Sequence, residues 1–126
     1  MKQIILSNNA PEPYGPYSQA VASGNLVFVA GQIPIDAADG QLVPGGIRAQ
    51  TRQVMEYIRA ILTEAGLDFS HVVKVSLFLT DLQVFAEVNE VYSNYFTGKF
   101  PARETVQVAA LPRNAAIEIS VIAVKP

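Results

Sequence analysis

Two periods of apolar residues divide the chain into segments of different structure. Apolar and polar side chains alternate over residues 73–79, 104–109 and 116–124, and shorter apolar runs cover residues 3–6, 18–22 and 26–30. Such segments, bounded by turn residues, are typical of β-strands. Gly24 and Asn25 separate the second and third runs, which predicts a hairpin there.

Helical spacing appears in two other segments. The first apolar stripe consists of Val54, Met55, Ile58, Ile61, Leu62 and Ala65, and Gly66 follows it as a stop signal. The second consists of Val84, Phe85, Val88, Val91, Tyr92 and Tyr95, with an end near Gly98. The sequence of residues 80–83 predicts a capping box at the start of this second helix, with Thr80 as the first residue of the box. The element order β-β-β-α-β-α-β-β predicts one α+β domain over residues 1–126.

Both predicted helices follow a strand and return to the sheet. Right-handed crossovers would place the two helices on the same sheet face, so the opposite face would be uncovered. The uncovered face is expected to carry Phe78, Ile122 and Val124 among the polar residues Ser76, Thr105 and Ser120. A half-apolar face of this kind favours packing between subunits.

Composition narrows the classes of function. Hydrophobic residues make up 50% of the 126 residues and charged residues only 16%, a second indication of an oligomer. The net charge of −2, without a basic run, argues against a nucleic-acid partner. No segment predicts a signal peptide or a membrane span, so a cytoplasmic protein is expected. The absence of cysteine excludes a thiolate nucleophile and a zinc–sulfur site.

Two charged residues stand out as candidates for chemistry. Arg103 follows Pro101 at the start of a strand, and Glu118 is the one acid inside an apolar strand. The two could be ion partners on neighbouring strands, which spacing alone favours. Alternatively they could face a small ligand, with Arg103 binding a carboxylate bidentately and Glu118 acting on water. The only histidine, His71, is expected at the surface before a strand and cannot form a metal site alone.

Five motifs carry a resemblance to a known family: GPYSQ (15–19), GQIP (31–34), FAEVNEVY (85–92), FPAR (100–103) and IEI (117–119). With these motifs the whole chain resembles the reactive intermediate deaminase (YjgF/RidA) family. The resemblance implies a chorismate-mutase-like fold, a mixed sheet with two helices on one face. It also implies a homotrimer whose bare sheet faces form a central barrel, with ligand clefts between subunits.

The resemblance further implies hydrolysis of enamines and imines such as 2-aminoacrylate to 2-oxo acids and ammonia, without a cofactor or metal. Arg103 would bind the substrate carboxylate, and Glu118 would position and activate water. Tyr17, Asn89 and the backbone N–H of Thr105 would line the cleft. From the residues alone, Tyr17 could instead be a loop anchor packed on the core, and Asn89 could only bridge backbone groups.

Three positions depart from the family pattern. Thr105 stands where relatives often have cysteine, a mild change if the backbone makes the contact. Ala30, next to Gly31 in the cleft, replaces a common serine, and Glu104 would add negative charge beside the anion site. Gly31 and Gln32 could also serve only a turn that leaves a strand. An alternative to this enzyme is a non-catalytic binding module for 2-oxo acids or similar carboxylates. A third possibility is nucleic-acid processing, but the negative net charge argues against it.

Overall fold

The computed structural model describes residues 1–126 and contains one sheet and two α-helices. The strands are β1 (Lys2–Ile5), β2 (Ala20–Ser23), β3 (Leu26–Gln32), β4 (Val72–Leu79), β5 (Ala102–Gln107) and β6 (Ile117–Val124), and the helices are α1 (Gly46–Glu64) and α2 (Phe85–Ser93). The strand order in the sheet is β1-β2-β3-β6-β4-β5. Only the β4–β5 pair is parallel, so the predicted mixed sheet and element order are confirmed.

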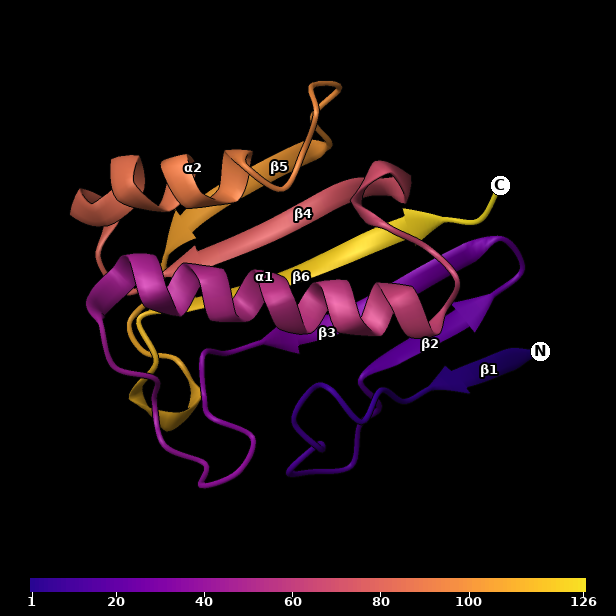
Figure 1. The fold of residues 1–126 in the computed structure, drawn as a ribbon, viewed down its shortest axis with the longest axis horizontal. Helices are drawn as coiled ribbons and strands as arrows, with labels where there is room; N and C mark the ends of the chain where they lie inside the picture. The colour runs from indigo at the N-terminus through magenta and orange to yellow at the C-terminus, as the bar shows by residue number, and fades with distance from the viewer.

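Both helices lie on the same face of the sheet, as predicted (Figure 1). Helix α1 buries Val54, Ile58, Ile61 and Leu62 of its predicted stripe, all at 0% exposure. These side chains belong to one cluster with the inward-facing residues of the strands, among them Leu77, Ile117 and Ile119. Transfer of such aliphatic side chains out of water is the main force that holds the layers together. Neither helix combines the length and hydropathy that a membrane crossing requires.

The opposite sheet face carries apolar side chains that no element of the chain covers. Phe28 and Val106 are exposed there, and each pairs with a further apolar residue, Phe28 with Ile122 and Val106 with Phe78. An uncovered apolar surface of this kind marks an interaction site.

The placement of Thr105 on this uncovered face was wrong. Thr105 pairs with Leu77, whose side chain is fully buried beneath the helices. Neighbouring residues in register share a face, so Thr105 points to the helix side.

The predicted helix ends are confirmed for α1 and wrong for α2. Gly66 follows the C-cap of α1 with φ of 77° and donates to the Thr63 carbonyl at 2.9 Å. The N-terminal capping box at Thr80 is absent, because the Thr80 N–H bonds to the Ala116 carbonyl at 3.2 Å and keeps this residue in the sheet. Asp81 is the cap instead, of a short 3₁₀ turn, and accepts from the Gln83 N–H at 2.9 Å.

Helix α2 ends at Ser93, five residues before the predicted end near Gly98. Tyr95 and Phe96 leave the helix and pack on Phe69. Their ring centroids lie 5.3 and 5.4 Å, respectively, from the centroid of the Phe69 ring. These edge-to-face contacts between aromatic rings stabilise the end of the helix at Ser93 over its continuation to Gly98.

Candidate active site

Arg103 lies on the edge strand β5, directly after Pro101 and the strand's first residue. It pairs with the buried Val75, so its side chain points toward the helices. The guanidinium carbon lies 4.7 Å from the ring centroid of Tyr92 and 5.4 Å from that of Phe85, both on α2. The chain places no carboxylate within ion-pair distance of Arg103. A cation is therefore held by two rings without a counterion.

Two polar atoms beside Arg103 lack partners. The hydroxyls of Tyr92 and Thr105 are buried and have no hydrogen bond. Burial raises the pKa of the Tyr92 hydroxyl, and Arg103 opposes that rise through its charge and as a nearby hydrogen-bond donor, although the two groups are not in good hydrogen-bond geometry. Unpaired buried polar atoms are rare in native proteins, so two of them beside a free cation suggest a place for a polar ligand.

Asn89 lies on the same side of α2 as Phe85 and Tyr92, because residues three and four apart are neighbours on a helix. Its side chain is half-buried, and its amide forms no hydrogen bond within the chain. The alternative that Asn89 bridges backbone groups is therefore wrong for the single chain.

Glu118 lies on the central strand β6 and pairs with Phe78, on the face that the helices leave uncovered. The residue is half-buried and has no ion partner. Loss of hydration raises the pKa of its carboxyl above the ordinary value of 4.5. A carboxylate without a counterion and with a raised pKa is a better proton acceptor than an exposed glutamate.

A β-bulge in β3 lies beside Glu118. Val29 pairs with Val121 and Gln32 with Ile119, so β3 has one residue more than β6 over this interval. The extra residue falls at Ala30–Gly31, two of the predicted cleft residues. Bulges occur frequently next to active sites, where they redirect the chain.

Gly31 gives the Glu118 side chain its space. A Cβ atom on Gly31 would lie 2.7 Å from the carboxyl carbon of Glu118, far inside van der Waals contact. Gly31 lies within β3, so the alternative that it only forms a turn after a strand is wrong. The sequence offered no signal for this contact, since the two residues are far apart in the chain.

Tyr17 and Gly31 line a small pocket of about 30 Å³ beneath the loop of residues 11–17. The Tyr17 side chain is 53% exposed, so it is not a loop anchor packed on the core. The anchor is the buried Gln19, which sequence reasoning missed. Its amide nitrogen donates to three carbonyls, those of Ser7, Ala10 and Pro11, and its oxygen accepts from the Ser7 N–H at 2.7 Å.

Arg103 and Glu118 are not ion partners. Strand β4 lies between β5 and β6, and the two side chains point to opposite faces of the sheet. Two strand spacings alone separate their backbones by about 10 Å. The structure therefore forms two separate groups: Arg103 with Asn89, Tyr92 and Thr105, and Glu118 with Gly31 and its neighbour Ala30. Tyr17 shares a pocket with Gly31, but Glu118 does not line that pocket.

Glu104 does not add charge beside Arg103, contrary to the expectation from sequence. Its side chain points to the uncovered face, where it accepts from the Ser76 hydroxyl at 2.6 Å and pairs with the Lys74 ammonium at 3.0 Å. The Ser76 hydrogen bond, followed by Lys74, lowers the pKa of Glu104. Consecutive strand residues face opposite sides, which separates Glu104 from its neighbour.

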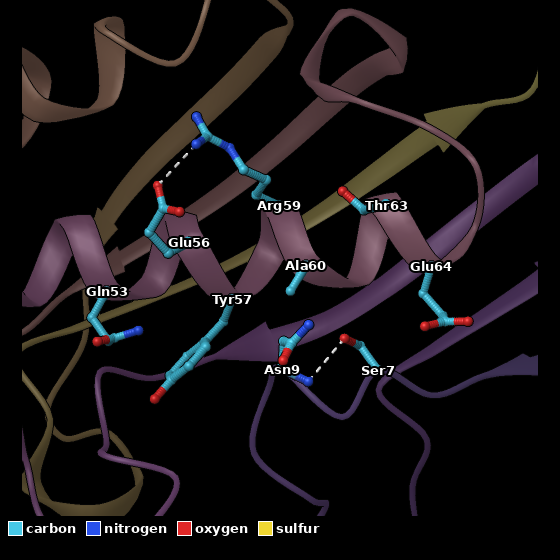
Figure 2. Close-up of a pocket in the computed structure, with 9 residues that line it drawn as sticks. All are labelled: Ser7, Asn9, Gln53, Glu56, Tyr57, Arg59, Ala60, Thr63 and Glu64. Carbon is cyan, nitrogen blue, oxygen red and sulfur yellow. Dashed lines mark hydrogen bonds and ion pairs between the residues drawn. The ribbon is translucent and has the colours of Figure 1, made fainter.

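Two other features of the fold lie apart from these residues. His71 ends a short 3₁₀ turn, where its Nδ1 accepts from the Asp68 N–H at 3.1 Å, and no cluster of three metal-binding side chains exists in the chain. A polar groove of about 430 Å³ follows α1 (Figure 2). It contains none of the predicted residues, and the Tyr57 hydroxyl at its edge donates to the Ile35 carbonyl.

Comparisons with known proteins agree with the fold and place the chain in a family. The family model described as endoribonuclease L-PSP matches residues 7–125. A RutC family protein of Pyrococcus horikoshii is 52% identical over 99% of both chains. Mouse 2-iminobutanoate/2-iminopropanoate deaminase is 44% identical over 99% of this chain and 93% of its own. Among solved structures, Escherichia coli TdcF with bound serine superposes with a TM-score of 0.93 at 40% identity, covering 98% of this chain and 99% of its own.

The chain therefore belongs to the endoribonuclease L-PSP family, also known as the YjgF/RidA family. The family resemblance carried by the five sequence motifs is confirmed.

Proposed function

We propose that the protein hydrolyses small imines that carry a carboxylate, such as 2-iminopropanoate and 2-iminobutanoate, to 2-oxo acids and ammonia. The observation that carries this proposal is the free guanidinium of Arg103 between two aromatic rings, with two unpaired hydroxyls beside it. Arginine binds carboxylates through two parallel hydrogen bonds. The mammalian relatives named for this activity and the TdcF structure with bound serine, another small carboxylate, support the assignment.

The chemistry requires few groups from the protein. Arg103 would hold the substrate carboxylate and neutralise its charge. Glu118 would accept a proton from water as the oxygen bonds to the imine carbon, and would return that proton to the nitrogen. The added oxygen still carries a hydrogen at this stage, so Glu118 would take this second proton as well and pass it to the nitrogen as the carbon–nitrogen bond breaks. Ammonia then leaves, and the carbon keeps its oxygen as the carbonyl of the 2-oxo acid. The raised pKa of Glu118 suits both the acceptance and the return of the proton.

A second copy of the chain completes the site in this proposal. Arg103 and Glu118 of one chain face opposite sides of the sheet, so neither can reach a ligand held by the other. The uncovered face with Phe28 and Val106 supplies an apolar surface for assembly. We propose a homotrimer with three clefts between subunits, each with Arg103 from one chain and Glu118 from its neighbour.

The decisive assay follows 2-oxo acid formation from 2-aminoacrylate that a dehydratase releases, with and without the protein. A faster release of the 2-oxo acid and ammonia is expected in proportion to the protein added. The same rate with and without the protein would reject the deaminase and leave a carboxylate-binding module, although a binding module has no need of an acid such as Glu118 beside its anion.

No observation on the chain favours the ribonuclease activity that the family description names. The net charge is −2, and the one histidine is occupied in a turn. Attraction of a polyanion usually requires a basic surface.

A further inference from the structure

The rings of Phe85 and Tyr92 both lie within cation–π distance of the Arg103 guanidinium, and these three side chains together are called the slot below. Tyr92 lies closer to the guanidinium carbon, at 4.7 Å from its ring centroid, and Phe85 lies at 5.4 Å. Both rings come from α2, about two helical turns apart on the same side of the helix. Arginine side chains have many rotamers, so a bidentate contact with a carboxylate depends on groups that fix the plane of the guanidinium.

Tyr92 has a second property that packing does not explain. The residue is 5% exposed, and its hydroxyl forms no hydrogen bond of good geometry, although the Arg103 guanidinium lies near it. A phenylalanine would fill the same space without leaving a buried polar atom unpaired, and an unpaired buried oxygen destabilises the fold. The oxygen is therefore free to accept a well-aligned hydrogen bond.

Arg103 is the donor that this oxygen can use. The guanidinium has five N–H groups and no carboxylate partner in the chain, and it already opposes the rise in the pKa of the Tyr92 hydroxyl through its charge and as a nearby donor. The second unpaired hydroxyl, on Thr105, lies two residues along the same strand face. A small rotation of the guanidinium within the slot would allow an N–H to donate to the Tyr92 oxygen.

We propose that Tyr92 is a positioning residue for Arg103, which stacks on the guanidinium and accepts a hydrogen bond from it when a carboxylate is bound. The inference rests on the anion site of the proposed function and adds the residue that sets its orientation. Phe85 forms the other wall and contributes no polar contact. The substitution that separates the two contributions of Tyr92 is Tyr92→Phe, which keeps the ring and removes the oxygen.

The test measures binding of 2-oxobutanoate by titration calorimetry and thermal unfolding on the same samples. Tyr92→Phe should bind about tenfold more weakly, the effect of one hydrogen bond to a charged group, while its melting temperature stays equal or rises. Tyr92→Leu, which also removes the ring, should bind more weakly still. The matched control is Tyr95→Phe, which removes a hydroxyl that donates to Glu56 at 2.7 Å outside the slot and should leave 2-oxobutanoate binding unchanged.

A merely structural tyrosine gives the opposite result, a lower melting temperature with unchanged affinity in the folded fraction, and that result would overturn the inference. Unchanged affinity with an unchanged melting temperature would overturn it too, as would a wild-type protein that does not bind 2-oxobutanoate. If the wild type binds 2-oxobutanoate but hydrolyses no imine, the proposed function fails, while the effect of Tyr92→Phe on binding still decides this inference. With an active enzyme, Tyr92→Phe should raise KM and leave kcat near its original value, because the carboxylate contact is the same in ground and transition states.

Discussion

Arg103 and Glu118 point to opposite faces of the sheet, and strand β4 separates the strands that carry them. Each residue has the surroundings of a functional group: Arg103 lacks a counterion, and Glu118 has a pKa raised by burial. One chain nevertheless holds them on opposite faces of the sheet, two strands apart. This geometry is the main reason to expect a site shared between subunits.

Coexpression of two inactive variants should therefore restore activity. In a ring of Arg103→Ala and Glu118→Gln subunits, some clefts combine an intact arginine from one chain with an intact glutamate from the next. With equal amounts and random assembly, about a quarter of the clefts are complete, and the same fraction of wild-type activity is expected. Separately purified variants, each assayed alone, are the control. A coexpressed sample as inactive as the two single variants would place both residues in one cleft from the same chain.

Arg103→Ala should lose activity without losing stability. Removal of one partner from a desolvated charge pair costs about 2–5 kcal/mol, so kcat/KM should fall about 10²–10³-fold. The melting temperature should change little, since Arg103 has no ion pair in the chain to lose. Arg103→Lys should also perform poorly, because an ammonium cannot reproduce the planar two-point contact. Steady-state kinetics and thermal melts on the same preparations check this, and full activity of Arg103→Ala would refute the carboxylate contact.

Glu118→Gln should separate binding from turnover. The amide keeps the shape of the side chain and removes the proton acceptor, a loss usually worth about 10²–10⁴-fold in rate. Binding of 2-oxobutanoate by calorimetry should persist, because Arg103 supplies that contact. Hydrolysis at the wild-type rate would show that Glu118 has a structural role only.

Glu118 should also make stability depend on pH. Its folded-state pKa lies above the ordinary value of 4.5, so the folded protein binds this proton more tightly than the unfolded chain does. The contribution of Glu118 to the free energy of unfolding should fall as pH rises from about 4.5 to beyond the raised pKa. Urea titrations from pH 4 to 7 at constant protein concentration should show Glu118→Gln gaining stability relative to wild type across this range. A difference between the two proteins that does not change with pH would contradict the raised pKa.

Gly31→Ala should destabilise the fold through Glu118. The new methyl group would overlap the glutamate carboxyl, and overpacking of this kind costs about 1–3 kcal/mol. Gly31→Ala combined with Glu118→Ala should recover most of that stability, because the second change removes the overlapping group. Gly15→Ala is a suitable control, since its nearest neighbour would be the Tyr17 ring at an ordinary 3.6 Å. Additive losses in the double variant, measured by urea unfolding, would argue against the contact.

Several features of this fold could be predicted from the sequence because they depend on local periodicity. The alternation of residues 73–79 and 116–124 and the stripe on α1 report directly which side chains face the core. The handedness of the two crossovers then placed both helices on one face and left the other uncovered. The motifs around Arg103 and Glu118 led to the family for the same reason, since they lie in short continuous segments.

Pairing between distant segments is what the tertiary structure alone decided. The insertion of β4 between β5 and β6 separates Arg103 from Glu118, and no local pattern states which strands become neighbours. The bulge at Ala30–Gly31, the space that Gly31 leaves for Glu118, and the side on which Thr105 and Glu104 point depend on register. A shift of one residue in register moves every side chain of a strand to the other face, and it is set by the packing of the whole sheet rather than by the strand itself.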